Sequence, residues 1–449
     1  MGTLMVSVSG IRGIYGDSLT PDIILKYVSA YAAYCKGKTI ILGRDSRKTG
    51  TSISDMIKGI LAASGYRVID CGIVPTPTVL LMVEKYNADG GIIITASHNP
   101  VEWNALKLAS RTGLFLTLEE GAEFLAMAEK GAHAYTQYSG IGYVETCDTA
   151  VDTHIEDILR SIDIEKIRAR RFHVILDCVH GAGGVMTPKL LDALHCTYSV
   201  LYEEPTGEFP RNPEPIPERL TELADTVRKK GADIGFAHDP DVDRLALVTD
   251  GGYAVSEEFT LALAAWSVFE RKKGVAVCNL STSRMIEDIA ARFGSSVVRT
   301  PVGEVNVADK MRIINAIVGG EGNGGVINPD VHYTRDAPVG IALILDLLAR
   351  HDRPVSALIQ DIPKYVMIKE KVSFSTLQER VVAMDRLHNL RSFEDAKINL
   401  EDGVRLDFNE GWIHIRPSGT EPIIRVIAEG ESEQWVRGMI DLIRKKMGI

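Results

Sequence analysis

The sequence predicts three related α/β domains followed by a smaller C-terminal α+β domain. Three segments repeat one order of patterns: an apolar β-branched run, a turn rich in Gly or Ser, an amphipathic helix and a second apolar run. A chain of 449 residues is also too long for one ordinary domain. The repeats recur roughly once per hundred residues, which indicates separate βαβ domains and excludes a short-period solenoid.

Each repeat predicts a strand, a helix and a second strand. The strands are expected at 39–43 and 66–69, at 172–176 and 198–201, and at 275–278 and 296–298, with helices after Gly50, near 190–194 and around Met285. After about residue 366 the pattern changes, because 366–374 and 411–429 favour antiparallel strands and 433–446 a terminal helix. We therefore predict domains at 1–150, 151–250, 251–365 and 366–449.

The composition is that of a globular protein and argues against several kinds of partner. The net charge of −10 disfavours nonspecific nucleic-acid binding, which needs a broad face of Lys and Arg. The six cysteines form no C-x-x-C pair, so we expect free thiols. The N-terminus lacks the features of a signal peptide, and no apolar run reaches the ~20 residues of a membrane helix. We therefore expect a cytoplasmic protein that binds neither nucleic acid nor membrane.

The first chemical motif is the segment 90–100, GGIIITASHNP, in which a buried-type strand opens into a polar loop. Parallel α/β sheets bind ligands at the carboxyl ends of their strands, where Ser97 stands. Its hydroxyl is a candidate nucleophile or phosphoryl carrier, and His98 is suited to handle a proton or contact a phosphate. Taken alone, the pair fits a structural interpretation better, with Ser97 capping a helix and Asn99-Pro100 forming a turn.

The second motif is the segment 232–244, ADIGFAHDPDVDR, which also runs from a strand into a polar loop. Asp239, Asp241 and Asp243 alternate, so their carboxylates can converge on one hard cation, and with a phosphate oxygen they suit Mg²⁺. Without a cation, three close carboxylates would repel one another. An EF-hand is excluded, because Arg244 stands where that loop needs Gly.

The third motif, GGEGNGG at 319–325, lacks the context of a dinucleotide site and the Lys of a P-loop. Glu321 and Asn323 lie on a loop without bulky side chains, so they suit hydrogen bonds to sugar hydroxyls. A plain Gly turn fits this segment equally well.

The fourth motif, IHIRPSGTEP at 413–422, combines Arg416, two hydroxyls and the backbone N–H groups around Gly419. Glycine lets the backbone approach a ligand closely and Arg binds phosphate bidentately, so the segment favours an anion-binding cradle. Arg425, on the next expected strand, adds a second positive charge.

Taken in this order, the four segments resemble the α-D-phosphohexomutase superfamily, whose members carry T-A-S-H-N-P, D-x-D-x-D-R, G-E-x-S-G-H and R-x-S-x-T-E-P motifs. Segments 9–13, 43–47 and 103–107 also resemble that family's first domain. The resemblance covers the whole chain. It implies mixed sheets in four domains that enclose one central cleft, in accord with the organisation predicted above.

The resemblance also implies a role for each candidate residue. Ser97 would be the phosphoserine and, with Asp239, Asp241 and Asp243, a ligand of Mg²⁺. The sugar phosphate would bind at Gly303, Glu321 and Asn323 and, through its distal phosphate, at Arg416, Ser418, Gly419 and Thr420, with Arg425 nearby. Around the reacting centre would lie Arg12, Arg44, His98, Lys107 and Arg244.

The reaction that these roles imply moves a phosphoryl group between C6 and C1 of a hexose phosphate. Phospho-Ser97 would give its phosphoryl group to a sugar hydroxyl, and the resulting hexose 1,6-bisphosphate would reorient before the other phosphate returns to Ser97. Positioning and charge neutralisation would carry the catalysis. His98 and Lys107 are both candidates for the general base.

The sugar-binding segment departs from the commonest family pattern, because Asn323 stands in place of Ser and Gly325 in place of His. The form G-E-x-N-G-G resembles a branch usually assigned to glucosamine phosphates, and the segment 300–304 resembles the T-x-V-G-D of the same group. We therefore expect interconversion of glucosamine 6-phosphate and glucosamine 1-phosphate, with mannose and glucose phosphates as the alternative. Glu304 beside Glu321 would suit a protonated amino group.

Two alternatives from other classes stay open. In an aspartyl-phosphate phosphatase, Asp239 would carry the phosphate and Ser97 would have no task. A sugar-phosphate-binding protein would use the same cleft without turnover.

Overall fold

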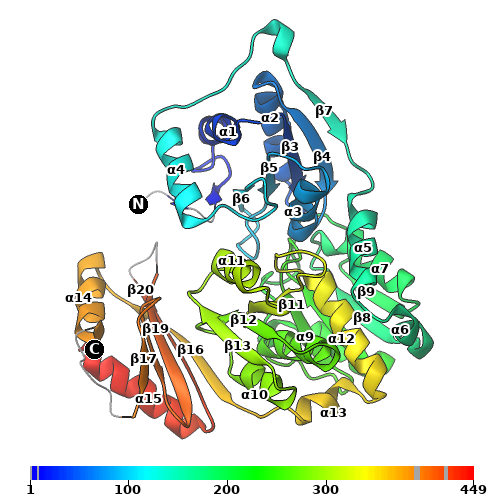
Figure 1. Ribbon diagram of the computed structural model, residues 1–449, viewed down its shortest axis with the longest axis vertical. Helices are drawn as coiled ribbons and strands as arrows, with labels where there is room; N and C mark the ends of the chain where they lie inside the picture. The colour runs from blue at the N-terminus through cyan, green and yellow to red at the C-terminus, as the bar shows by residue number, and fades with distance from the viewer. Residues whose placement is uncertain (1–2, 8–9, 389–394, 419–422, 449) are drawn as a thin grey trace.

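The structure is a computed structural model that describes residues 3–7, 10–388, 395–418 and 423–448. Over these residues the chain forms four sheets, each built from its own stretch of sequence (Figure 1). The sheets change over between Thr146 and His173, between Thr249 and Val275, and between Ile327 and Val366. We propose that the domain seams lie within these intervals, near 150, 250 and 365.

The first sheet is mixed and has seven strands in the order β1-β2-β6-β5-β3-β4-β7. Its strands are β1 (Met5–Ser7), β2 (Gly10–Ile14), β3 (Thr39–Arg44), β4 (Arg67–Ile73), β5 (Gly90–Ile94), β6 (Trp103–Ala109) and β7 (Tyr143–Thr146). The helices of this domain are α1 (Pro21–Cys35), α2 (Gly50–Ala63), α3 (Thr76–Lys85) and α4 (Leu118–Glu129).

The second and third sheets have four strands each, in the orders β11-β10-β8-β9 and β13-β12-β14-β15. The second domain contains α5 (Ala150–Arg160), α6 (Ile164–Arg170), β8 (His173–Asp177), α7 (Gly183–Ala193), β9 (Thr197–Leu201), α8 (Thr221–Lys230), β10 (Ile234–His238) and β11 (Leu245–Thr249). The third contains α9 (Glu258–Arg271), β12 (Val275–Asn279), α10 (Met285–Arg292), β13 (Ser296–Thr300), α11 (Glu304–Ile314), β14 (Val318–Glu321), β15 (Gly325–Ile327), α12 (Ala337–His351) and α13 (Val355–Gln360).

One arrangement of four strands recurs in the first three sheets. The first two strands pair in parallel, the third lies parallel on the other side of the first, and the fourth returns antiparallel beside the third. The loop that follows or ends the third strand carries candidate residues each time: Ser97 follows β5, Asp239 follows β10, and Glu321 ends β14. The predicted relationship among the three α/β domains is confirmed, and it places their site loops at equivalent positions.

The fourth sheet is antiparallel throughout, in the order β16-β20-β19-β18-β17. Its elements are β16 (Val366–Ser373), α14 (Leu377–His388), β17 (Lys397–Asn399), β18 (Val404–Asp407), β19 (Gly411–Pro417), β20 (Ile423–Gly430) and α15 (Glu433–Met447). The predicted α+β domain is confirmed, but α14 was not expected from the sequence. Its apolar residues divide between the core, which includes Ala383, Met384 and Leu387, and the surface, where Leu377, Val381 and Val382 are exposed.

The predicted turn at 181–184 was wrong in part, because α7 begins at Gly183 and not near Leu190. A Cβ on Gly183 would lie 2.5 Å from His238 Nδ1, and one on Gly184 only 1.9 Å from the Glu203 carbonyl oxygen. These glycines therefore serve close packing of the helix start against neighbouring segments, and not only chain reversal.

The hydrophobic core also groups the domains. One cluster of buried residues continues from the first domain into the third, for example from Ile41 through Leu176 to Leu343. The fourth domain has its own cluster, which includes Leu406 and Ile440. None of the helices over the described residues is both long and apolar enough to cross a bilayer. The six cysteines are free thiols, as expected.

Candidate active site

Ser97 stands on a tight loop directly after the buried strand β5. Every residue of Gly90–Ile94 is buried, because the strand lies between β6 and β3 inside the first sheet. Ser97 adopts a left-handed backbone conformation with φ of 49°, which is unusual for a residue with a side chain. Such a conformation persists only where surrounding contacts hold it.

Arg47 supplies those contacts. Its fully buried guanidinium donates four hydrogen bonds, at 2.6 to 2.9 Å, to the carbonyls of residues 97, 99, 100 and 103. Asp45 pairs with the same guanidinium at 3.1 Å and accepts from Thr95 at 2.7 Å. Arg47 is not among the site residues that the sequence predicts, because its partners are main-chain groups 50 to 56 residues away.

Replacing Arg47 with Leu is expected to destabilise the protein by about 3–5 kcal/mol, because buried carbonyls and the Asp45 carboxylate lose their partner. Urea unfolding measures this free energy. Lys48→Leu is the matched control, since that side chain is 65% exposed, and its effect should stay within about 0.5 kcal/mol. Equally small effects in the two variants would mean that Arg47 does not hold the loop.

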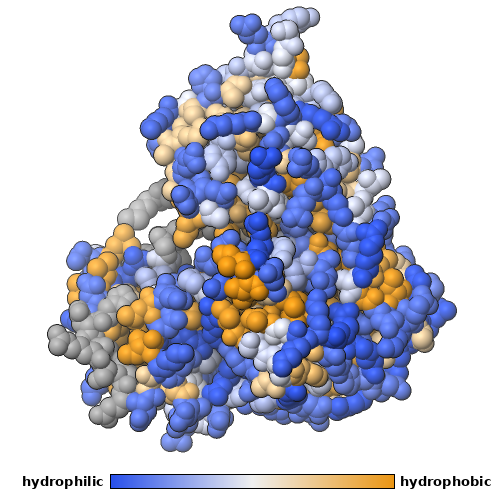
Figure 2. Space-filling view, in the orientation of Figure 1, coloured by the Kyte–Doolittle hydropathy of each residue, from blue (hydrophilic) through white to orange (hydrophobic). Residues whose placement is uncertain are grey.

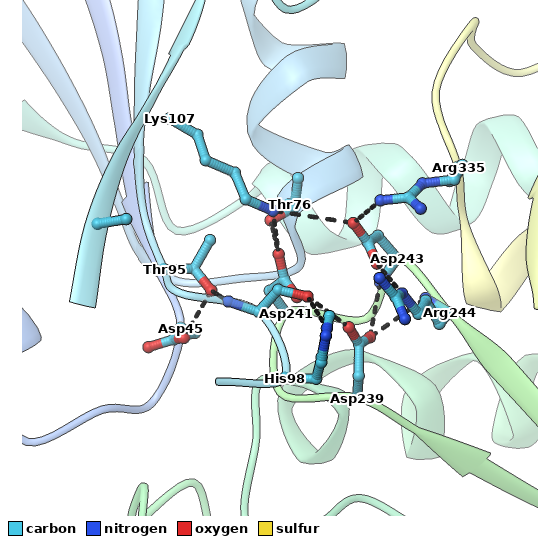
Figure 3. Close-up of polar contacts among 12 residues, drawn as sticks. Asp45, Thr76, Thr95, His98, Lys107, Asp239, Asp241, Asp243, Arg244 and Arg335 are labelled. Atoms are coloured by element: carbon cyan, nitrogen blue, oxygen red, sulfur yellow. Dashed lines mark hydrogen bonds and ion pairs between the residues drawn. The ribbon is translucent and has the colours of Figure 1, made fainter. Parts of the chain in front are cut away.

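Three carboxylates of the second domain lie together close to His98 (Figure 3). Asp239, Asp241 and Asp243 each offer an oxygen, and these three atoms lie within 4.8 Å of one another. The Ser97 hydroxyl donates to Asp239 Oδ2 at 3.0 Å. The Oδ1 atoms of Asp241 and Asp243 are buried without a hydrogen-bond partner among the described residues. Orphaned carboxylate oxygens of this kind fit a hard divalent cation such as Mg²⁺.

The pKa values of these carboxyls follow from burial and from crowding of charge. Burial, and next the charges of Asp243 and Asp241, raise the pKa of Asp239 well above its ordinary value. Burial also opposes ionisation of Asp241, yet the charge and hydrogen bond of Lys107 outweigh it and lower the pKa of that carboxyl. Asp239 is therefore the carboxyl whose ionisation is least favourable here, and a bound cation would favour its charged form.

Basic side chains from two domains surround this cluster. Lys107 Nζ, from β6, lies 2.8 Å from Asp241 Oδ2 and 3.8 Å from Asp243 Oδ2. Arg244 Nε lies 3.8 Å from Asp243 Oδ1, and Arg12, from β2, donates at 2.6 Å to the loop that carries Ser97. These cations stand where the oxygens of a phosphate on Ser97 would need neutralising.

The two candidate bases differ in charge state. His98 Nδ1 lies 3.2 Å from the Ser97 hydroxyl. Burial, followed by the charges of Arg244 and Arg12, lowers the pKa of His98 to about 2, so its imidazole is neutral. Burial opposes the charge of Lys107, but Asp241 and Asp243 raise its pKa above the ordinary value. His98 is therefore neutral but only a weak base in this state of the site, whereas Lys107 is a fixed positive charge.

The end of β14 brings Glu321 to the opposite wall. Glu321 Oε1 accepts from the Asn279 side chain at 2.7 Å and from the Gly303 N–H at 3.1 Å. Its other oxygen accepts from Arg335 at 2.9 Å, and Glu304 Oε2 accepts from the same guanidinium at 3.2 Å. The two acidic residues expected to favour an amino group are thus balanced by Arg335, a residue that belongs to none of the sequence motifs.

The fourth domain contributes a pair of arginines. Arg416 on β19 and Arg425 on β20 stand directly opposite in the antiparallel register. Cβ atoms at such positions are about 5 Å apart, so the two positive charges repel unless an anion lies between them. Arg416 Nε is 3.3 Å from Asp402 Oδ2, which balances part of the charge. Ser418 follows at the end of β19, and Gly419 and Thr420 lie outside the described residues.

A cavity of about 600 Å³ lies beside the carboxylate cluster. The three aspartates are not part of its lining, but they contact the lining residues Ser97, Lys107 and Arg335. Its lining comes from all four domains and includes Arg12, Ser97, His98, Lys107, Arg244, Gly303, Glu321, Asn323, Arg335, Arg416 and Arg425. The surface is hollowed between the upper and lower parts of the molecule (Figure 2). Arg44 lies apart from this lining, and its guanidinium donates to the Asp45 carbonyl at 3.2 Å.

Known proteins share both this fold and this order of motifs. Four domain families match the chain in succession: phosphoglucomutase/phosphomannomutase α/β/α domain I at 4–134, domain II at 152–252, domain III at 256–365, and the C-terminal domain at 379–446. The chain therefore belongs to the phosphoglucomutase/phosphomannomutase (α-D-phosphohexomutase) family, as its motifs indicate.

Individual relatives match over nearly the whole chain. A probable phosphoglucosamine mutase of Methanopyrus kandleri is 36% identical over 444 residues, which cover 97% of each chain. A phosphoglucomutase/phosphomannomutase of Thermococcus kodakarensis is 37% identical over 442 residues, 96% of each chain. A solved phosphoglucomutase/phosphomannomutase family protein from Burkholderia thailandensis superposes with a TM-score of 0.87 at 26% identity, covering 99% of this chain and 98% of that one.

Proposed function

We propose that this phosphohexomutase interconverts glucosamine 6-phosphate and glucosamine 1-phosphate through phosphorylated Ser97 and a 1,6-bisphosphate. The observation that carries the proposal is the 3.0 Å contact between the Ser97 hydroxyl and Asp239, at the wall of a cavity lined with basic side chains. A serine held in this position can pass a phosphoryl group to a sugar in the cavity.

Mg²⁺ is the cation that the carboxylate cluster fits. Asp239, Asp241 and Asp243 would hold it together with an oxygen of residue 97, because two of their buried oxygens accept no hydrogen bond from the described residues. When bound, Mg²⁺ would neutralise charge on the oxygens of the transferring phosphoryl group. The remaining neutralisation falls to Lys107 and Arg244.

The reaction proceeds in two transfers at one centre. The phosphoryl group of Ser97 passes to a hydroxyl of the bound sugar phosphate, and the O–P bond to the serine breaks. The hexose 1,6-bisphosphate then reorients, and its other phosphate returns to Ser97. His98, 3.2 Å from the Ser97 hydroxyl, is by position our candidate to hold the proton that the sugar hydroxyl loses. Its low pKa makes it a weak base until the negative charge of a phosphate on Ser97 raises that pKa.

The two ends of the sugar phosphate need different partners. The opposed Arg416 and Arg425 suit the phosphate that does not react, because an anion between them relieves their repulsion. Glu321 and Asn323 suit the sugar hydroxyls and have to accept two orientations of the ring. Because all four residues line the same cavity, one bound molecule can reach both regions.

The preference for glucosamine rests on the sequence of two loops and on the names of several relatives. The form G-E-x-N-G-G and the segment 300–304 support it, as does the similarity to the Methanopyrus enzyme. The similarity to the Thermococcus enzyme supports glucose or mannose phosphates as the second candidate. Free thiols support the proposal that the enzyme works in the cytoplasm.

A side-by-side panel tests the substrate. Purified protein is assayed with Mg²⁺ and a trace of glucose 1,6-bisphosphate on the 6-phosphates of glucosamine, N-acetylglucosamine, glucose and mannose. We expect the highest kcat/KM with glucosamine 6-phosphate, by about 10-fold or more, the gain that one well-placed polar contact supplies. A higher value with glucose or mannose phosphate would assign the enzyme to the second candidate, and no turnover on any sugar would favour a binding protein.

A further inference from the structure

Arg335 occupies the centre of the site without belonging to any recognised motif. It lies in the segment between β15 and α12, and its side chain is 10% exposed. Its guanidinium donates to Asp243 Oδ2 at 2.6 Å and to Glu321 Oε2 at 2.9 Å, and Figure 3 shows it directed at Asp243. One side chain of the third domain therefore joins the cation-binding loop of the second domain to the sugar loop.

The segment that carries Arg335 is anchored on both sides. The Arg335 N–H and its Nε both donate to Glu304, at 2.9 and 3.2 Å. The next residue, Asp336, caps α12 through the Val339 N–H at 3.1 Å and lies 2.7 Å from His154 Nε2 of the second domain. A guanidinium held in this way has little freedom, so its planar fork can fix the carboxylates that it bridges.

Arg335 also fills the place that a side chain at position 325 would occupy. A Cβ on Gly325 would lie 2.3 Å from Arg335 Cδ and 2.8 Å from its Cγ. The commonest motif of the family has His at this position, so the glycine of this chain leaves a space that the aliphatic part of Arg335 fills. The glycine at 325 and the position of the Arg335 side chain are therefore structurally linked.

We propose that Arg335 replaces the missing side chain at 325 and acts as a positioning residue, which sets Asp243 for the cation and Glu321 for the sugar at the same time. Asp243 uses Oδ2 for Arg335, and its Oδ1 accepts no hydrogen bond from the described residues. A hydrogen bond to one oxygen of a metal-binding carboxylate orients the other oxygen toward the metal. The inference rests on the proposed function, because it assigns Arg335 to that site.

Calorimetric titration of dephosphorylated protein with MgCl₂ measures the first half of the proposal. Arg335→Ala is expected to weaken Mg²⁺ binding about 10-fold or more, because Asp243 loses the contact that orients it. Arg335→Lys keeps the charge but not the fork, so we expect it to recover only part of the loss. Arg312→Ala, an exposed arginine on α11, is the control and should leave binding unchanged. Unchanged or tighter binding in Arg335→Ala, or full recovery with Lys, would overturn the positioning role.

A double-mutant cycle between positions 325 and 335 tests whether Arg335 occupies the volume that a side chain at position 325 would fill. Gly325→His collides with Arg335 and is expected to lower kcat/KM about 100-fold, as is Arg335→Ala, with most of the loss in kcat. The double variant gives His the vacated volume, so we expect it to be at least about 10-fold more active than Arg335→Ala. If the fold-losses in kcat/KM of the two single variants simply multiply in the double variant, the two positions do not share this volume and the proposal is refuted.

Thermal melting of each variant shows whether a loss of activity comes from unfolding or from misplaced side chains in a folded protein. If Gly325→His does not fold alone while the double variant does, the shared volume is supported directly. If neither folds, the shared volume is overturned, because the vacated volume then fails to accept the side chain. If the proposed function is wrong, the wild-type protein will turn over none of the sugar phosphates. The Mg²⁺ titrations would still decide the role of Arg335 in that case.

Discussion

Ser97→Ala is expected to lower mutase turnover by at least about 10³-fold, because it removes the atom that carries the phosphoryl group between the two transfers. The fold should persist, since the change removes one oxygen from a small side chain, and the free energy of unfolding should change by about 1 kcal/mol or less. A coupled assay on the best substrate of the panel measures the first quantity, and urea unfolding the second.

The matched control is Ser110→Ala. Ser110 is also a buried serine of the first domain, but its hydroxyl contacts Thr112 at 2.8 Å and faces no part of the carboxylate cluster that the structure describes. It should keep turnover within a few-fold of the wild type. Turnover at the wild-type rate in Ser97→Ala would remove the phosphoserine from the mechanism.

Asp241→Asn is expected to weaken Mg²⁺ binding by about 100-fold or more and to lower turnover at least as strongly, because a carboxylate that touches the cation is worth more than one of its supporting contacts. The change keeps the shape of the side chain, so the contact with Thr76, at 2.8 Å, can be retained. Lys107 would then lack its nearest negative partner, which adds unbalanced positive charge close to the cation.

Asp225→Asn is the control for that variant. Asp225 lies on α8 with its side chain 54% exposed, and it pairs only with Arg228 in the described structure. Calorimetry with MgCl₂ and the coupled assay should find both quantities unchanged in this control. Wild-type Mg²⁺ affinity in Asp241→Asn would contradict the assignment of the carboxylate cluster as the cation site.

The sequence reveals those motifs whose chemistry can be predicted from residue type and from position after a strand. Ser97 and the three aspartates lie on loops that follow buried strands, so strand pattern and residue type together predict a site at the carboxyl edge of a sheet. The three-plus-one organisation follows in the same way from a repeated βαβ pattern. The residues around each motif do not show how the loops of separate domains come together, and the site forms only where these loops meet.

Arg44, Arg47 and Arg335 show where such prediction ends. Arg44 and Arg47 belong to one short segment, and only the fold reveals that Arg47 reaches under the Ser97 loop while Arg44 contacts the Asp45 carbonyl. Arg335 lies 92 residues from Asp243, and its position depends on a glycine at 325 that leaves room for it. Contacts of this length depend on tertiary packing, which periodicity and spacing do not encode.

The helix α7 makes the same point for secondary structure. A run of glycines at 181–184 predicts a turn by composition. The structure instead starts a helix at Gly183, where glycine is needed because a side chain would meet His238. The glycines are needed by the neighbouring strand and loop, which a local pattern cannot represent.

Mapping the phosphate on the phosphoenzyme tests the central claim most directly. Protein incubated with glucose 1,6-bisphosphate and Mg²⁺ is quenched, digested and examined by peptide mass spectrometry under conditions that preserve both phosphoserine and acyl phosphate. The account predicts a single phosphate on Ser97, absent from Ser97→Ala and discharged when sugar 6-phosphate is added. Phosphate on Asp239, with Ser97 unmodified, would contradict it and would identify an aspartyl-phosphate phosphatase in its place.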